Sequence, residues 1–409
     1  NNILKNSFKD FDGGYALAGM IGHGSSFIAR DPNGIRPLYY YLNDEVIVAT
    51  SERPPIKTAF GCSFDEIKEV ERGHALIVNK DASYSIEKFV DQKEDRSCSF
   101  ERIYFSRGND PEIYEERKTL GRLLIPQILE SIDNDLKNTI FSYIPNTSET
   151  CFYGMIDGLK NHINLLKNDV FIENKSYNGS KTDLISLKIR MEKLVSKDVK
   201  MRTFITDDNS RNELVSNIYD TTSGVVKRNK DTIVVIDDSI VRGTTLEKSI
   251  LTLLSSLDAK KVIFVSSSPQ IRYPDCYGID MAKLGDFIAF QAAVGLLEDN
   301  GKISLIDEVY QLCKSAEGKG SLKDENFVKK IYEPFTDEEI SKKIAQLLTH
   351  DQINADVDII FQTVENLHKA CPGHTGDWYF TGNYPTPGGN KVVNKSFINY
   401  VEGVNKRAY

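Results

Sequence analysis

Residues 232–245 read TIVVIDDSIVRGTT and carry the clearest structural signal in the chain. The first five of them are all β-branched, which is typical of a strand buried on both faces of a parallel sheet. The spacing then predicts a helix over 244–257, with Thr244 and Glu247 placed as a capping box, and the apolar run at 261–265 predicts the next strand. Strand, helix and strand within about 33 residues form a βαβ unit with a right-handed crossover, so this part of the chain is predicted to be an α/β domain.

The loop between the predicted strand and helix combines two adjacent acids, Asp237 and Asp238, with small and hydroxyl-bearing residues. The small and hydroxyl-bearing residues are Ser239, Gly243, Thr244 and Thr245. Ligands of open α/β sheets bind outside the carboxyl ends of the strands, which is where this loop falls. Such a loop can wrap a phosphate in backbone N–H groups, with the positive end of the helix dipole behind it.

The two acids of this loop point to the rest of the ligand. Carboxylates repel a phosphate but suit ribose hydroxyls or Mg²⁺. A loop that can bind a phosphate, placed beside two acids, therefore implies one ligand with a phosphate, a sugar and a metal-bound pyrophosphate. Phosphoribosyl pyrophosphate has all three groups. An acid pair after a strand is often only a solvated turn, and Gly-Thr-Thr an ordinary helix start. The whole run at 237–245 in its βαβ setting favours the ligand site.

Length and composition exclude several classes of protein. The chain has 409 residues, with 51 Lys and Arg against 59 Asp and Glu, and its net charge of −8 disfavours a protein that coats nucleic acid. No apolar run approaches the length of a membrane span, and no signal-peptide pattern opens the chain. Six cysteines are scattered without paired spacing, as in a reducing compartment: Cys62, Cys98, Cys151, Cys276, Cys313 and Cys371. We expect a soluble cytoplasmic protein of two or three domains, without a membrane or a nucleic acid as partner.

The region before the α/β unit has a different pattern. Residues 13–92 are predicted to form a sandwich or a layered sheet, because short apolar runs alternate with turn residues. The runs lie at 15–22, 26–29, 38–41, 46–49 and 75–78. Because the chain opens on Asn1 without a clear cap or strand, we expect it to begin inside a domain.

The remaining elements are predicted from the spacing of apolar residues. We expect helices over 115–133, 150–166 and 184–195, a strand over 139–144 with a loop over 145–148, and charged helices over 314–346. The predicted domains are 1–92, 93–310 with a Lys-rich insertion at about 167–200, and a helical and irregular tail over 311–409.

Residues 235–245 resemble the phosphoribosyl pyrophosphate fingerprint of the amidophosphoribosyltransferases, glutamine-dependent enzymes that open purine synthesis. Further stretches resemble the same family in the family's order: 30–38 (RDPNGIRPL), 98–107 (CSFERIYFSR), 202–205 (RTFI) and 273–281 (YPDCYGIDM). The resemblance covers roughly residues 13 to 310 and implies an α/β fold: a phosphoribosyltransferase-type parallel sheet. It makes 1–92 the remainder of an α+β glutaminase domain of the N-terminal nucleophile hydrolase type, and the chain an N-terminally truncated member.

The resemblance also implies a role for each site residue. Asp237 and Asp238 would bind the ribose hydroxyls and Mg²⁺, and the loop over 144–148 the pyrophosphate, with Thr147 near the metal and Ser148 beside it. The 5′-phosphate would be held by Ser239, Ile240, Val241, Arg242, Gly243, Thr244 and Thr245. Mg²⁺ and backbone donors would stabilise the leaving pyrophosphate while ammonia, taken from glutamine in the full-length protein, attacks the ribose to give 5-phosphoribosylamine. A homo-oligomer inhibited by purine nucleotides is implied as well.

The sequence departs from the family at its glutaminase centre. The family's nucleophile is an N-terminal cysteine, whereas residue 1 is Asn and the thiols of Cys62 and Cys98 are internal. We expect both to be buried thiols, and we assign no catalytic residue to the glutaminase part. As given, the chain is expected not to hydrolyse glutamine.

A second departure concerns the iron–sulfur cluster of one branch of the family. Cys98 falls at a ligand position, but the other positions fall on Asp275, Gly376 and Tyr379. A cluster requires four thiolates, so none is expected here.

A third departure is an acidic loop, TDDNSRNE at 206–213, where the family is usually basic. Arg202 and Arg211 are candidates for phosphate contacts, and surface ion pairs are the alternative for both. Because of the acidic loop, a second interpretation stays open: the chain is a catalytically silent regulator that binds phosphoribosyl pyrophosphate without turnover. A salvage-type transferase with a nucleobase acceptor is also open, although the β-rich region at 13–92 argues against it.

Overall fold

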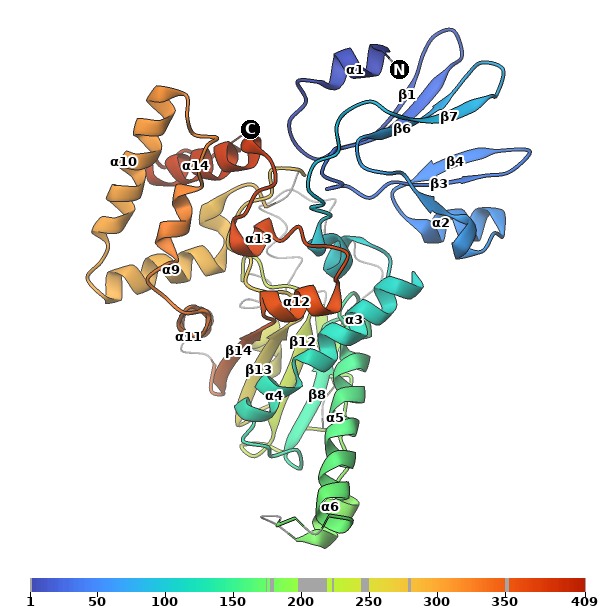
Figure 1. The fold of residues 1–409 in the computed structure, drawn as a ribbon. Helices are drawn as coiled ribbons and strands as arrows, with labels where there is room; N and C mark the ends of the chain where they lie inside the picture. The colour runs from blue at the N-terminus through green and yellow to red at the C-terminus, as the bar shows by residue number, and fades with distance from the viewer. Residues whose placement is uncertain are drawn as a thin grey trace.

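The computed structural model describes residues 2–173, 175–176, 180–197, 219–222, 224–243, 250–278, 281–349 and 353–408. A five-stranded parallel sheet, in the order β14-β13-β12-β8-β9, forms the centre of its α/β part (Figure 1). The strands are β8 (Thr139–Tyr143), β9 (Arg190–Met191), β12 (Thr232–Asp237), β13 (Lys261–Ser266) and β14 (Asp356–Phe361). β12 lies in the middle, and the Ile233–Ile236 side chains have no solvent exposure, which confirms the predicted buried strand and the α/β fold class.

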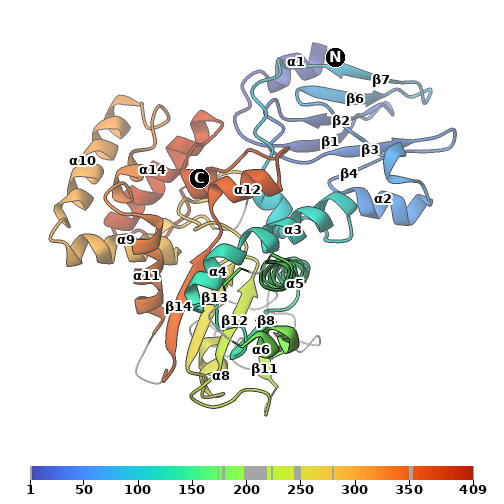
Figure 2. The same ribbon diagram turned by 60° about the horizontal axis from the view of Figure 1, so that its bottom comes forward.

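Helices cover both faces of this sheet (Figure 2). They are α3 (Pro111–Leu123), α4 (Ile125–Ser131), α5 (Glu149–Phe171), α6 (Lys181–Ser186), α8 (Thr252–Ser255), α9 (Ile288–Asp299), α11 (Asp337–Leu348) and α12 (Val364–Ala370). α3 and α5 pack with their backbones almost in contact. A Cβ at Gly154 would lie 1.9 Å from the Lys118 carbonyl oxygen, and a Cβ at Gly121 would lie 2.0 Å from that of Cys151. The two glycines therefore set the spacing between α3 and the first turns of α5.

The N-terminal part is a sandwich of two antiparallel sheets, as the alternation of short runs and turns predicted. The four-stranded sheet contains β1 (Ala16–Met20), β2 (Ser26–Arg30), β6 (His74–Val78) and β7 (Tyr84–Lys88); the three-stranded sheet contains β3 (Tyr39–Leu42), β4 (Ile47–Thr50) and β5 (Lys68–Glu69). Ala29 packs against α1 (Asn2–Phe8) on the outer face of the larger sheet, whereas its neighbour Ile28 packs between the sheets. α2 (Arg53–Phe60) covers the smaller sheet through Ile56, so the layers run helix, sheet, sheet, helix.

A short π-helix, η2 (Glu101–Phe105), follows the sandwich and leads into α3. The C-terminal region adds α10 (Ser304–Lys319), α13 (Trp378–Thr381) and α14 (Pro387–Val401), which pack beside α9 (Figure 1). Trp378 and Tyr379 are fully buried in the main core, so this part of the C-terminal region packs against the α/β part.

Several predicted elements differ from the structure. The predicted helix over 184–195 is wrong, because the chain leaves α6 at Ser186 and pairs as β9 with β8, then as β10 (Val195–Lys197) with β11 (Tyr219–Thr221). The predicted helix over 115–133 is broken into α3 and α4, where Pro126 at the start of α4 cannot donate a backbone hydrogen bond. Of the predicted helix over 244–257, residues 244–249 lie outside the described residues.

The C-terminal region was expected to be helical and irregular, yet β14 pairs in parallel with β13 at the edge of the sheet. The sequence of β14, DVDIIF, alternates only in part, because the strand is buried at one end and exposed at the other. The strand was therefore not predicted. The domain boundary at 310 remains a prediction, but the region beyond it contributes to the central sheet.

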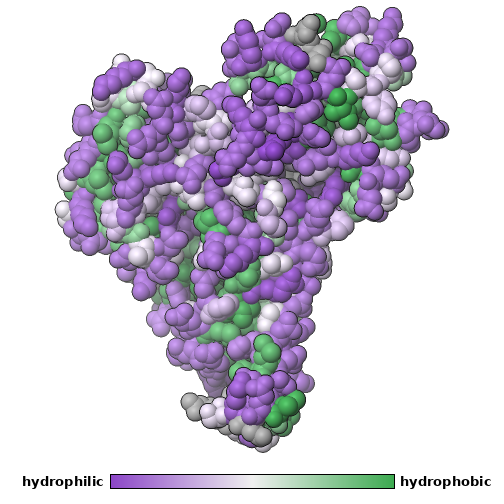
Figure 3. Space-filling view, in the orientation of Figure 1, coloured by the Kyte–Doolittle hydropathy of each residue, from purple (hydrophilic) through white to green (hydrophobic). Residues whose placement is uncertain are grey.

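The surface seen in Figure 3 is mainly hydrophilic, with apolar residues at the tip of the molecule where α5 ends. Phe171 and Ile172 at the end of α5, and Ile185 on α6, belong to this exposed tip. None of the helices in the described part of the chain combines the length and the hydropathy that a membrane crossing requires.

Candidate functional site

The acid pair lies at the carboxyl end of the central strand, as predicted. Asp237 is the last residue of β12, and its carboxylate accepts a hydrogen bond of 2.8 Å from the backbone N–H of Asp238. Ser267, after β13, donates from its backbone N–H to the Asp237 carbonyl at 2.9 Å and from its hydroxyl to the Asp238 carbonyl at 3.1 Å. The neighbouring strand end thus fixes the backbone of both acids.

Both carboxyl groups are difficult to ionise without a counter-charge. Loss of hydration and the neighbouring Asp238 raise the pKa of Asp237 well above its usual value, although Lys197 on β10 opposes this. Loss of hydration raises the pKa of Asp238 to about 6, against hydrogen bonds from Ser239 and Thr147 and the charge of Arg117. Both side chains keep partial solvent exposure, so a ligand or a cation can reach them.

The loop after β8 lies directly beside the acid pair. The backbone N–H of Ile144 donates to the Ile236 carbonyl at 2.9 Å, which extends the pairing of β8 and β12 up to the site. Thr147 on this loop lowers the pKa of the Asp238 carboxyl group. Ser148 is fully buried and donates its hydroxyl to the Ile144 carbonyl, so its side chain shapes the loop and is turned away from a ligand.

The described part of the predicted phosphate loop is well anchored. The Ser239 hydroxyl donates to Asp238 at 3.0 Å, Ile240 is buried, and the Val241 carbonyl accepts from the Ile288 N–H at 2.9 Å. Gly243 has φ +74°, which favours glycine, and a Cβ there would lie 3.0 Å from Leu348.

Not every predicted site residue is seen at the acid pair. Arg242 extends toward Asp286 at 4.0 Å, and both side chains are 42% exposed, as in a surface ion pair. Thr244, Thr245, Arg202 and Arg211 lie outside the described residues, as does the acidic loop at 206–213.

The donor set fits Mg²⁺. Two carboxylates and the Thr147 hydroxyl converge, and all three are hard oxygen ligands. Among the residues that the structure describes, no group of three or more His, Cys, Asp and Glu side chains forms a closed metal site. Mg²⁺ commonly takes one or two carboxylates and completes its coordination shell with substrate phosphates and water.

Arg117 is a buried arginine that sequence reasoning missed. It lies on α3, is 4% exposed, and its charge acts on both Asp238 and Cys151. An arginine on an amphipathic helix is usually a surface residue, so its spacing gave no signal. The glycine at i+4, Gly121, was the available hint, because a glycine inside a helix marks a close approach that buries its neighbours.

The four positions that resemble cluster ligands do come together. Cys98 forms a backbone bridge with Gly376, and burial together with the nearby Asp275 raises the pKa of Tyr379. Arg36 lies among them, 3.8 Å from the Asp275 carboxylate and 2.7 Å from that of Glu101. The set supplies one thiol, a carboxylate, a phenol and a glycine, which is a polar network and not the thiolate set of a cluster. Cys62 and Cys98 are both buried, as expected, and burial raises the pKa of the Cys98 thiol.

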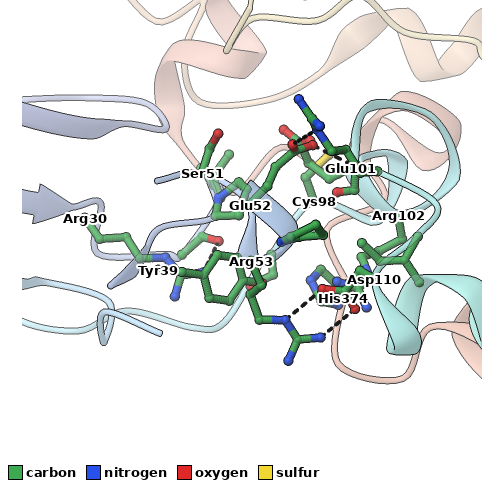
Figure 4. Close-up of a pocket in the computed structure, with 18 residues that line it drawn as sticks. Arg30, Tyr39, Ser51, Glu52, Arg53, Cys98, Glu101, Arg102, Asp110 and His374 are labelled. Atoms are coloured by element: carbon green, nitrogen blue, oxygen red, sulfur yellow. Dashed lines mark hydrogen bonds and ion pairs between the residues drawn. The ribbon is translucent and has the colours of Figure 1, made fainter. Parts of the chain in front are cut away.

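A small cavity of about 20 Å³ lies at the junction of the sandwich and the α/β part, and Figure 4 shows its lining. Arg53 from α2 donates twice to Asp110, at 2.8 and 2.6 Å, and so ties the two parts together. The lining arginines Arg30, Arg53 and Arg102 each pair with a carboxylate, and the space suits about one water molecule, so we assign the chemistry to the acid pair instead.

Comparison with known proteins gives one consistent set of relatives. No family model matches the chain. Amidophosphoribosyltransferases of Pasteurella multocida and Bacillus subtilis are each 30% identical to it, over 300 and 303 residues, and that of Lachancea kluyveri is 29% identical over 302 residues. The matches cover 71% of this chain and between 52% and 54% of the relatives. The chain thus spans about half the length of the curated relatives it matches.

Solved structures lead to the same group. The glutamine phosphoribosylpyrophosphate amidotransferase of B. subtilis, complexed with ADP and GMP, superposes with a TM-score of 0.60 at 25% identity, covering 93% of this chain and 66% of that one. A structure described as the allosteric regulatory enzyme of purine biosynthesis gives a TM-score of 0.59 at 25% identity, covering 93% and 64%. The chain is therefore homologous to the amidophosphoribosyltransferases and has the α/β fold of their solved structures.

Proposed function

We propose that this chain binds phosphoribosyl pyrophosphate with Mg²⁺ at the acid pair and transfers the phosphoribosyl group to ammonia. The products are 5-phosphoribosylamine and pyrophosphate. One observation carries the proposal: the acid pair after β12 and the loop over 144–148 after β8 meet at the carboxyl edge of the sheet, where the Ile144 N–H donates to the Ile236 carbonyl at 2.9 Å. Homology to amidophosphoribosyltransferases supports the same reaction class.

Different residues of the site bind different groups of the ligand. Asp237 and Asp238 accept hydrogen bonds from the ribose hydroxyls, and the backbone of the loop over 239–243 holds the 5′-phosphate. Asp237, Asp238 and Thr147 would hold Mg²⁺, which when bound would supply positive charge toward the leaving pyrophosphate. As the bond from C1 to the pyrophosphate oxygen breaks, positive charge grows on the ribose ring, and the nearby carboxylates stabilise it. The ammonia nitrogen bonds to C1 and releases a proton to solvent.

The test measures pyrophosphate release from phosphoribosyl pyrophosphate and Mg²⁺, with and without ammonium chloride, beside calorimetric binding of the same ligand. Release that depends on ammonia supports the proposal. Release only with adenine, guanine, hypoxanthine, uracil or orotate identifies a salvage-type transferase. Tight binding without product under any nitrogen source identifies a binding regulator, and absence of binding contradicts the proposed site.

We also infer regulation by purine nucleotides. The related B. subtilis enzyme was solved with ADP and GMP, which supports nucleotide binding in this group of proteins. Adding ADP and GMP to the pyrophosphate-release assay is expected to lower the rate. An unchanged rate at millimolar nucleotide would argue against this inference.

A further inference from the structure

The loop over 144–148 is closed by a hydrogen bond between the two residues that flank it in the chain. Tyr143 is the last residue of β8, and Glu149 is the first residue of α5. The Tyr143 hydroxyl donates to the Glu149 carboxylate at 3.3 Å. The end of the strand and the start of the helix are therefore joined through their side chains as well as through the loop itself.

Ring packing holds the same two ends together. The rings of Tyr143 and Phe152 lie 5.0 Å apart, centroid to centroid, and Phe152 is a buried residue of the first turn of α5. A pair of aromatic rings adds stability beyond the area that it buries. The packing fixes the direction of the Tyr143 side chain, and with it the place of the hydroxyl that reaches Glu149.

Backbone and hydroxyl contacts inside the loop complete a closed turn. The Ser148 hydroxyl donates to the Ile144 carbonyl, and the Glu149 N–H donates to the Asn146 carbonyl at 3.2 Å. Thr147 lies within this turn, at the position that the proposed function assigns to the cation and the pyrophosphate. The loop is therefore tied to itself by its own contacts and tied to the strand and the helix by the side chains that flank it.

A second tyrosine binds the same carboxylate and provides a comparison. The Tyr153 hydroxyl donates to the same Glu149 oxygen, Oε1, at 2.7 Å, but Tyr153 is 46% exposed and lies one turn further along α5. Its bond to Glu149 joins two residues of one helix and does not cross the loop. Of these two bonds, only the one from Tyr143 restrains the loop.

We propose that Tyr143 and Glu149 are positioning residues for the pyrophosphate: their hydrogen bond holds the loop that carries Thr147 in the geometry that binds this group. The inference rests on the proposed function for the identity of the ligand. A loop that is ordered before the ligand arrives loses less conformational entropy on binding, so the bond raises the affinity for pyrophosphate. It has no such effect on the ribose and the 5′-phosphate, which are assigned to the loop after β12.

The experiment compares Tyr143→Phe with the matched control Tyr153→Phe, because each substitution removes only a hydroxyl that binds Glu149 Oε1. Calorimetry measures the Kd of each variant for magnesium pyrophosphate and, separately, for ribose 5-phosphate. We expect Tyr143→Phe to raise the Kd for pyrophosphate about fivefold and to leave the Kd for ribose 5-phosphate unchanged. The control is expected to match the wild type for both ligands.

Variants of Glu149 test the other end of the bond. Glu149→Ala is expected to reproduce the loss of pyrophosphate affinity, and Tyr143→Phe is expected to add nothing in that background. Glu149→Gln keeps an acceptor oxygen for the Tyr143 hydroxyl and is expected to restore the affinity. Thermal unfolding of each variant shows that it is folded when its Kd is measured.

Several results would overturn the inference. These are an unchanged Kd for pyrophosphate in Tyr143→Phe, an equal rise in the Tyr153→Phe control, an equal rise for ribose 5-phosphate, and losses from Tyr143→Phe and Glu149→Ala that simply add. If the wild type binds neither pyrophosphate nor ribose 5-phosphate, the proposed function itself fails. Wild-type binding of both ligands with no change in the variants contradicts only this inference.

Discussion

The backbone N–H of Ile144 donates to the Ile236 carbonyl at 2.9 Å, so the parallel pairing of β8 with β12 continues to the carboxyl edge of the sheet. The loop that carries Thr147 and the acid pair therefore leave neighbouring strand ends. A hydroxyl loop and an acid pair therefore form one site. Because the site is built from strand ends of the most deeply buried part of the fold, its geometry is set before any ligand binds.

Replacing both acids tests their role directly. Asp237→Asn with Asp238→Asn is expected to abolish donor binding and pyrophosphate release, because the ligands for the cation and the ribose are lost. The two carboxylates repel each other, so the apo variant is expected to melt at or above the wild-type temperature. Calorimetry and thermal unfolding measure the two effects. A large loss of thermal stability would instead indicate a structural role for the acids.

Variants of Thr147 and Ser148 are expected to change different properties, the first donor affinity and the second the stability of the fold. Thr147→Val removes the hydroxyl that is proposed to hold Mg²⁺ and that lowers the pKa of Asp238, so donor affinity is expected to fall several-fold with little change in melting temperature. Ser148→Ala removes a buried bond to the Ile144 carbonyl, and we expect a loss of about 1–2 kcal/mol in the free energy of unfolding. The reverse pattern, a stability loss for Thr147→Val only, would contradict the assigned roles.

The contact between α3 and α5 is expected to tolerate no side chain at Gly154. A Cβ there would lie 1.9 Å from the Lys118 carbonyl, so Gly154→Ala must push the helices apart and is expected to cost about 2 kcal/mol or more. Gly318→Ala is the matched control, because this α10 glycine has nothing within 4 Å of its Cβ position. The control is expected to be neutral or stabilising by up to about 1 kcal/mol in urea unfolding. Equal effects in the two variants would show that the close approach is not real.

His374 is expected to make the fold sensitive to acid. Burial lowers its pKa from 6.5 to about 3, with Arg102 and Arg30 adding to the shift and Asp95 opposing it. In the folded protein the imidazole stays neutral, whereas in the unfolded chain it takes up a proton below pH 6.5. The free energy of unfolding therefore falls as the pH decreases from 6.5 toward 3, and the loss is about 2 kcal/mol at pH 5.

Urea unfolding of His374→Gln at pH 7.5 and pH 5 measures this contribution, with the exposed His23→Gln as the control. The wild type and the control are expected to lose stability between the two values, and His374→Gln is expected to lose less. An identical loss in all three would contradict the buried neutral state of His374.

The sequence was sufficient where one local pattern set both structure and chemistry. The β-branched run before Asp237 could only be a buried strand, and the loop after it had to fall at the carboxyl edge. The burial of Arg117 could not be found in this way, because it lies on α3, whose close approach to α5 at Gly121 and Gly154 is a tertiary contact that local spacing does not reveal. For the same reason strands replaced the predicted helix over 184–195. β9 pairs with β8 and β10 pairs with β11, and these partners from elsewhere in the chain outweigh the local spacing of apolar residues.

A crystal structure of the chain with magnesium and phosphoribosyl pyrophosphate tests the central claim most directly. We expect the ribose and the cation against the carboxylates of Asp237 and Asp238, with the pyrophosphate on the loop that carries Thr147. A donor seated at any other place, with both aspartates free of ligand, would contradict the account.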